Sequence, residues 1–139
     1  MNTPYVQPPR PRLPWRHRPA AWTAVALAHL LARQPPTRMK RLLIQARRRA
    51  RPATQAEAEA ARSTIVAASR SCAGEGCLPR AIATFLLCRM RGTWPTWCTG
   101  VRLYPFSAHA WVEADGEPAG ESFSPGHYIP VITVPPQTC

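Results

Sequence analysis

"GEGCLPRAIATFLLC", residues Gly74 to Cys88, places a cysteine between a glycine-rich corner and a nearly continuous apolar run. A proline at position 79 suits the first turn of a helix, where its missing N–H would have no partner. We therefore expect a helix over 78–91, with Cys77 at its cap and Gly92 at its end. Because the run leaves little polar face, this helix should be central and buried. Its expected core side chains are Ile82, Phe85, Leu86, Leu87 and Met90.

The cap position gives the Cys77 thiol a candidate chemical role. The positive end of a helix dipole lowers a thiol pKa and favours the nucleophilic thiolate. Gly74 and Gly76 allow a substrate carbonyl to approach, and the backbone amides beside Cys77 are candidate oxyanion donors. Cysteines at helix caps are more often inert small residues, so the interpretation depends on a partner base elsewhere in the chain.

Among the four histidines, His109 is the candidate base. His17 falls in a Pro/Arg-rich arm, His29 on an apolar helix and His127 in a Pro/Gly loop. His109 stands in "SAHAWVEADGEPAGE", in an expected strand where Trp111 points to the same side. A strand histidine next to a nucleophile-bearing helix is a candidate general base.

Hairpin geometry indicates Glu121 as the acid that completes the set. If residues 114–116 form a three-residue loop, His109 lies opposite Glu121, and opposed residues share a face. Glu121 would then orient and charge-stabilise the imidazole. This register opposes Glu113 to Glu117, a like-charge pair. A two-residue turn at 115–116 would instead move Glu121 to the other face.

The rest of the pattern predicts helices in the first half and strands in the second. Helices are expected over 20–33, from Thr37 up to Pro52, and from a capping box at 54–57 to about Arg70. Strands are expected at 98–104, 108–114 and 117–123, and "YIPVITV" is compatible with a fourth. The expected class is α+β, with N-terminal helices and the central helix packed on a small antiparallel sheet. The buried stripes are expected to be Met39, Leu42, Leu43 and Ala46, and Ala58, Ala61, Ile65 and Ala68.

Length and proline content indicate the domain organisation. The chain has 139 residues, enough for one domain, and 17 prolines that cluster at its ends. Residues 1–19 form a Pro/Arg-rich arm that we expect to be ordered only when bound. Residues 20–139 are expected to form a single domain, helical over 20–91 and with its sheet over 97–134.

The chain is strongly basic, with 18 Lys and Arg against 7 Asp and Glu and a net charge of +11. Such a balance is typical either of a protein with an anionic partner or of a solvated basic face. No phosphate loop, zinc-finger spacing or RNA-binding aromatic signature is present, so no nucleic-acid partner is expected.

The cysteines and the apolar segments indicate in which cellular compartment the protein is expected. Five cysteines at irregular spacing fit neither a disulfide framework nor a metal site, and a reducing cytoplasm suits them best. The apolar stretch at 20–32 is too short to span a bilayer and lacks a signal-peptide cleavage pattern, so no membrane span is expected. No cofactor or metal is expected.

The stretch from Gly74 to Glu121 resembles the stand-alone leader peptidases of lasso-peptide biosynthesis, which belong to the transglutaminase-like cysteine protease superfamily. The resemblance is strongest in "CLPR", "GV…PF" and "HAWVEADG". It implies a transglutaminase- or papain-like fold, with Cys77 as nucleophile, His109 as base and an acidic residue on the next strand. Glu121 matches that position, although relatives carry Asp there.

The resemblance also implies the biological setting. The substrate would be a ribosomally made precursor peptide, cut between leader and core. A small separate recognition protein would grip the leader, and an ATP-dependent lasso cyclase would close the macrolactam.

Three other functions remain open at the level of sequence. A transamidase or amide hydrolase would use the same thiol, imidazole and acid. A non-enzymatic basic adaptor would use Cys77 only structurally. A nucleic-acid-binding protein would use Arg47–Arg51 and would show a steep salt dependence.

Overall fold

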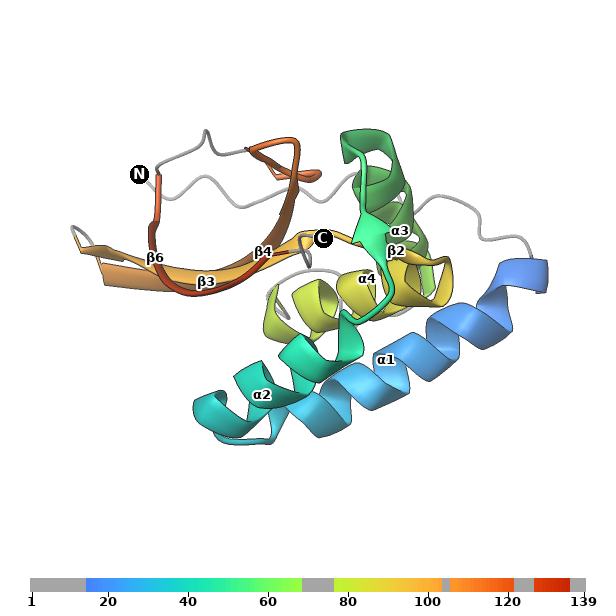
Figure 1. The fold of residues 1–139 in the computed structure, drawn as a ribbon, viewed down its shortest axis with the longest axis horizontal. Coiled ribbons are helices and arrows are strands. Elements are labelled where there is room, and N and C mark those ends of the chain that lie inside the picture. Colours follow the sequence, from blue (N-terminus) through green and yellow to red (C-terminus); the bar gives the residue numbers. More distant parts are fainter. Residues whose placement is uncertain (1–14, 69–76, 104–105, 122–126, 136–139) are drawn as a thin grey trace.

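The computed structural model describes residues 15–68, 77–103, 106–121 and 127–135. Within these residues a group of helices packs against an antiparallel sheet, which confirms the predicted α+β class (Figure 1). The helices are η1 (Trp15–His17), α1 (Arg18–Ala32), α2 (Pro36–Ala46), α3 (Gln55–Ala68) and α4 (Cys77–Met90). The strands are β1 (Arg51–Pro52), β2 (Thr93–Trp94), β3 (Thr96–Leu103), β4 (Phe106–Ala114), β5 (Glu117–Pro118) and β6 (Ile129–Val134).

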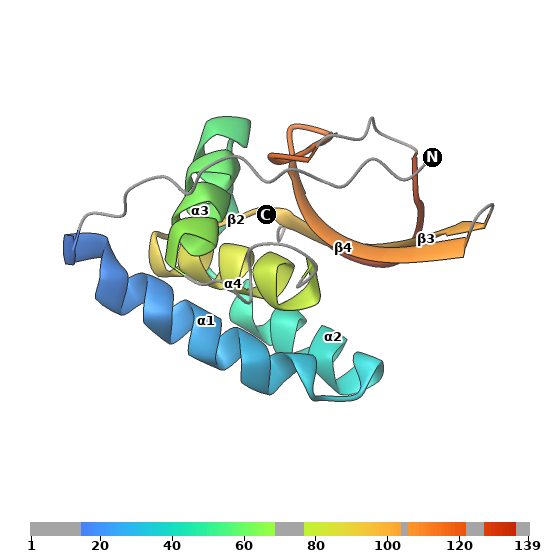
Figure 2. The same ribbon diagram turned by 180° about the vertical axis from the view of Figure 1, so that it is seen from behind.

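Helix α4 occupies the centre of the fold, as its apolar sequence predicts. It lies between α1 and α3 on one side and the sheet on the other, and Figure 2 shows the same arrangement from behind. Ile82, Phe85 and Leu87 are fully buried. Gly92 ends the helix with a φ of 84°, the left-handed conformation that glycine adopts most easily. The prediction for Met90 is wrong: it sits in the last turn and is 46% exposed.

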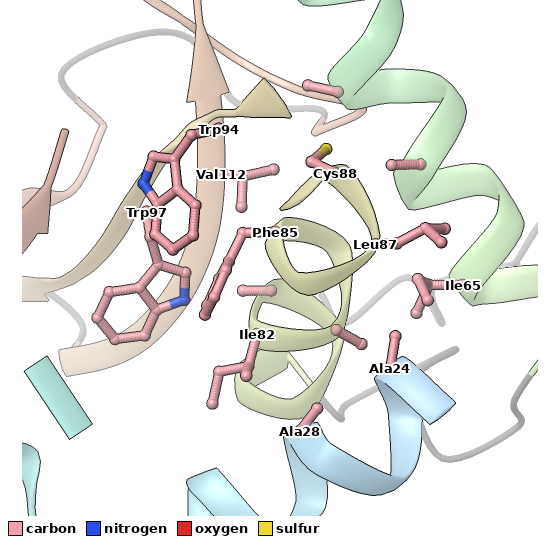
Figure 3. Close-up of a cluster of buried hydrophobic side chains, with 14 of the residues drawn as sticks. Ala24, Ala28, Ile65, Ile82, Phe85, Leu87, Cys88, Trp94, Trp97 and Val112 are labelled. Carbon is pink, nitrogen blue, oxygen red and sulfur yellow. The ribbon is translucent and has the colours of Figure 1, made fainter. Parts of the chain in front are cut away.

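The core places aromatic side chains on one face of α4 and small or aliphatic side chains on the other (Figure 3). The Phe85 ring centroid lies 4.9 Å from that of Trp94 and 6.4 Å from that of Trp97. On the helical side, Ala24 and Ala28 of α1 are completely buried. Alanine's small side chain lets two helices approach closely, which explains why an alanine-rich α1 forms so much of the helical interface.

Helix α2 ends earlier than predicted. Its stripe is partly correct, because Met39 and Leu43 are buried while Leu42 is 36% exposed. The helix stops at Ala46, and Arg89 of α4 donates from Nε to the Ala46 carbonyl at 2.7 Å. This bond satisfies a C-terminal carbonyl that would otherwise lack a partner, so α4 fixes where α2 ends. The following residues 51–52 pair in parallel with β2.

Helix α3 begins at the predicted capping box. Thr54 Oγ1 accepts from the Glu57 amide at 3.2 Å, and Glu57 Oε1 accepts from the Thr54 amide at 3.1 Å. The Arg51 guanidinium also contacts Glu57, and these contacts lower the pKa of that carboxyl to about 2. The inner stripe of Ala58, Ala61 and Ile65 is buried as expected. The predicted end near residue 70 lies outside the described residues.

The sheet has the strand order β5-β4-β3-β6, with antiparallel neighbours throughout. The predicted three-residue loop between β4 and β5 is wrong. Asp115 and Gly116 alone form the turn, with φ values of 55° and 78°, the conformation that matches the twist of a two-residue hairpin. Asp115 Oδ2 also accepts from the Gln55 amide at 3.0 Å, so the turn is tied to the start of α3.

The third and fourth predicted strands differ in outcome. β5 contains only residues 117–118 instead of 117–123. β6 forms as the "YIPVITV" pattern allows, and it contains a bulge: Thr99 pairs with Ile132 while Gly100 pairs with Pro130. Val131 is therefore an extra residue on β6 that has no partner on β3. Among the described residues, no helix combines the length and the apolar character that crossing a bilayer requires.

Candidate active site

Cys77, which was predicted to be the cap, is the first residue of α4, and its side chain is half-buried. Its pKa is lowered from the usual value chiefly by a side-chain hydrogen bond with His109, assisted by the Ala110 backbone amide and the nearby charges of His109 and Arg80. Burial acts in the opposite direction, but the favourable contacts outweigh it. The surroundings of Cys77 therefore favour the thiolate.

His109 lies on β4 and joins the thiol to a carboxylate. Its Nε2 lies 3.4 Å from Glu121 Oε1, an ion-pair contact that leaves Nδ1 as the nitrogen available to the thiol. Burial by itself lowers the pKa of His109, yet the contacts with Cys77 and Glu121 raise it overall to about 9. At neutral pH the imidazole is therefore protonated, and it forms an ion pair with a carboxylate on one side and an ionisable thiol on the other.

Glu121 reaches His109 by a route that differs from the predicted one. Glu113 pairs with Pro118, a register that, if continued, would set Glu121 opposite Ala110 on the face that packs against α4. The ladder stops instead at Pro118, and Gly120 turns the chain with a φ of 65°. Glu121 thus lies beside His109, as expected, although the predicted hairpin register is wrong.

A second contact holds the Glu121 carboxylate. Nη2 of Arg62, on α3, lies 3.7 Å from Glu121 Oε1. The positive φ of Gly120 favours glycine, and a Cβ there would lie 2.8 Å from Arg62 Cδ, so any other residue would displace the Arg62 side chain. Arg62 was not predicted; it lies next to Ala61 of the buried α3 stripe, and only the tertiary structure reveals its partner.

Two aromatic rings stack near the imidazole of His109. The His109 ring is nearly parallel to Trp111, with centroids 6.0 Å apart, and its centroid lies 5.3 Å from that of Tyr128. Trp111 Nε1 donates to Glu113 at 2.9 Å, which fixes the indole. Gly100 faces His109 across the β3–β4 ladder, and a Cβ there would lie 2.8 Å from Trp111 Cη2. Tyr128 had no signal in the sequence, because it comes from a segment distant along the chain.

An open cleft of about 280 Å³ exposes this arrangement. It lies where α4 begins beside β3 and β4, and apart from the thiol and imidazole its lining side chains are uncharged and mostly apolar. The lining residues are Cys77, Leu78, Thr99, Gly100, Val101, Ala108, His109, Ala110 and Val131. At the edge of this accessible cleft, the imidazole lies between the thiol and the carboxylate. Nucleophilic acyl transfer requires these three groups.

The other cysteines that the structure describes lie in different surroundings. Burial raises the pKa of Cys88 to about 11 and that of Cys98 to about 12. Cys72 and Cys139, like the predicted glycine corner at 74–76, lie outside the described residues. Of the other histidines, His127 contacts Arg102 Nη1 at 3.1 Å. Among the described residues, no group of three or more His, Cys, Asp and Glu side chains could hold a metal ion.

The chain belongs to the transglutaminase-like superfamily, whose family model matches residues 21–133. This match includes most of α1, all of α2, α3 and α4, the strands up to residue 133, and the positions of Cys77, His109 and Glu121. The scaffold is accordingly that of cysteine peptidases and transamidases. Comparison with curated proteins and with solved structures gave no match.

Proposed function

We propose that this protein is a cysteine peptidase that removes the leader from a ribosomally made lasso precursor peptide. The observation that carries the proposal is the contact series from the Cys77 thiol through His109 to Glu121, at the rim of an open cleft. Membership in the transglutaminase-like superfamily supports the class of chemistry. The resemblance of the "CLPR" and "HAWVEADG" segments to lasso leader peptidases supports the choice of substrate.

The proposed mechanism has two halves: acylation of Cys77 and hydrolysis of the resulting thioester. Cys77 and His109 act in both. The Cys77 thiolate attacks the scissile carbonyl, and backbone N–H groups at the start of α4 stabilise the oxyanion. The His109 imidazolium then gives its proton to the leaving amine, which breaks the peptide bond and leaves a thioester on Cys77. Neutral His109 next accepts a proton from water, and the resulting hydroxide adds to the thioester carbonyl. The C–S bond then breaks, which releases the acid and restores the Cys77 thiolate beside protonated His109. Glu121 keeps the ring oriented and stabilises its positive charge.

The proposal includes a separate leader-recognition protein and a lasso cyclase as partners, in a reducing cytoplasm. The exposed basic side chains of α2, among them Arg38, Lys40 and Arg41, provide a surface that would attract an acidic partner. In this arrangement the helices contribute docking, and the cleft contributes the chemistry.

The test is a cleavage assay with the precursor peptide, the recognition protein and this chain, read by mass spectrometry. We expect one cut at the leader–core junction and none with Cys77→Ala, provided that circular dichroism shows the variant folded. An uncut precursor, or cleavage that persists in folded Cys77→Ala, would overturn the proposal.

A transamidase is the second candidate, because the superfamily includes enzymes that pass an acyl group to an amine. The same assay with an added primary amine separates the two. A peptidase yields free acid, whereas a transamidase yields a product heavier by the amine minus water.

A further inference from the structure

The outer end of the sheet continues past the helix that covers the rest of it. Along β4, Ala110 and Val112 are buried against α4, whereas Phe106, which shares their face by alternation, is 72% exposed. The reason is that α4 begins at Cys77 and does not extend over this part of the sheet. Figures 1 and 2 show β3 and β4 extending beyond α4.

The uncovered part of the sheet carries apolar side chains from three strands. Leu103 pairs with Phe106 and Val101 pairs with Ala108, so these four share one face. On the other side of β3, Ile129 pairs with Val101 and joins the same face. Leu103 is 54% and Ile129 is 55% exposed. We name this surface the apolar shelf; it consists of Val101, Leu103, Phe106, Ala108 and Ile129.

The shelf is continuous with the cleft beside Cys77. Val101 and Ala108 belong to both, because they line the cleft and also form the inner end of the shelf. The bulge in β6 adds a further apolar group: Val131, the extra residue, is 65% exposed and lines the cleft. Bulges commonly redirect a side chain beside a functional site. An apolar path therefore leads from the sulfur toward the far end of the hairpin.

The side chains along this path indicate which kind of ligand it can bind. In a chain of net charge +11, the cleft is lined by no Lys or Arg among the described residues, and the shelf residues are all apolar. From Ala110 to Phe106 is four residues of strand, about 13 Å, which four residues of an extended peptide also span. Contiguous exposed apolar surface of this kind is typical of a binding site.

We propose that the apolar shelf binds apolar side chains of the peptide substrate, within about four residues on one side of the bond that Cys77 attacks. The proposal rests on the peptidase function and adds its specificity: the enzyme selects for aliphatic or aromatic residues at these positions and against charged ones.

The first experiment uses a positional decapeptide library, incubated with the full chain, with the products sequenced by mass spectrometry. We expect Leu, Ile, Val or Phe to be preferred over Glu or Lys at least tenfold at one or more of the four positions on one side of the cut. Phe106→Ser and Ile129→Thr should reduce kcat/KM about tenfold for the preferred peptide and leave a serine-substituted peptide nearly unaffected. Met90→Ser is the matched control, an exposed apolar residue at the opposite end of α4. Equal losses on both peptides, or no loss, would overturn the proposal.

The second experiment measures binding without cleavage, so that the shelf and the peptidase function are tested separately. A fluorescein-labelled Leu-rich decapeptide is titrated into folded Cys77→Ala protein, and anisotropy is compared with the same protein carrying Phe106→Ser. We expect at least a fivefold weaker Kd for the double variant. If no peptide is cleaved but binding depends on Phe106, the shelf stands and the peptidase function fails. If peptides are cleaved but neither rate nor binding depends on Phe106, the shelf fails. A change in oligomeric state with Phe106→Ser by sedimentation, without an effect on peptide binding, would assign the surface to a second copy of the chain.

Discussion

Cys77 and Cys88 lie three turns apart on α4, yet the pKa of one thiol is lowered and that of the other is raised. Cys77 is half-buried in the first turn, where His109 and the Ala110 amide lower its pKa. Cys88 is 1% exposed on the core side, and burial raises its pKa to about 11 even though Thr93 provides a hydrogen bond. Thiol reactivity in this protein therefore depends on what surrounds each sulfur, and the helix by itself does not decide it.

The two thiols differ because Cys77 lies at the boundary of the helix and Cys88 lies in its packed interior. Cys88 is enclosed by packed side chains, as an apolar helix interior requires (Figure 3). Cys77 stands where the helix begins, so β4 can present a backbone amide and an imidazole to it while the cleft remains open.

The largest expected effect is the difference in alkylation between the two thiols. With a pKa of about 11, Cys88 at pH 7 is about ten-thousandfold depleted in thiolate, and it is also shielded from reagent. Brief iodoacetamide treatment followed by peptide mass spectrometry should therefore modify Cys77 and not Cys88, with activity lost in parallel. Modification of Cys88 first, or modified Cys77 with full activity, would contradict the assignment.

Removal of the imidazole should have the next largest effect. Proton transfer by a positioned base contributes about a hundred- to ten-thousandfold in rate, so His109→Ala should lose at least that much in kcat. The same variant should raise the pKa of Cys77, because the hydrogen bond with His109 that lowers it most is gone. If alkylation rates are measured from pH 5 to pH 10, the rise in the rate of Cys77 modification should occur at a higher pH in the variant than in the wild type. The pH dependence of Cys77 would then be closer to that of Cys88. An unshifted rise would mean that the helix end alone activates the thiol.

Glu121→Gln should reduce kcat about tenfold, less than the histidine variant, because the acid orients and charges the imidazole without transferring its proton. The sign of the pH effect follows from His109: Glu121 helps to raise its pKa to about 9, so the neutral amide should lower that pKa. Activity in the wild type should fall as pH rises through about 9, where the imidazolium loses its proton. In the variant this fall should begin at a lower pH. Asp115→Asn, at the two-residue turn, is the control and should keep the wild-type profile.

The smallest effect is expected on the basic surface of α2, which contributes no group to the contacts around Cys77. Reversing the exposed charges in Arg38→Glu and Arg41→Glu should slow processing of the full precursor a few-fold when the recognition protein is present, and the effect should fade with added salt. Unassisted cleavage and the melting temperature should stay nearly unchanged. If stability and both reactions fall together, α2 only covers the core and does not dock a partner.

The local sequence was sufficient to predict where α3 and α4 begin and which side chains of β4 share a face. Pro79 and the apolar run fix the start of α4 and hence the place of Cys77 at its positive end. The Thr54–Glu57 box fixes the start of α3, and alternation in β4 places Trp111 on the same side as His109. These features depend on residues within about four positions of one another, so their geometry follows from the backbone periodicity of a helix or a strand.

The contacts around His109 depend on the tertiary structure. Glu121 reaches His109 only because Gly120 turns the chain out of the β5 register and Arg62 of α3 lies close to the carboxylate. Tyr128 reaches the imidazole from a segment whose distance along the sequence gave no signal. Phe106 lies outside the predicted strands, and the exposure of the apolar residues around it follows from where α4 begins. Each of these contacts joins segments far apart in the chain, and no local periodicity encodes such a meeting.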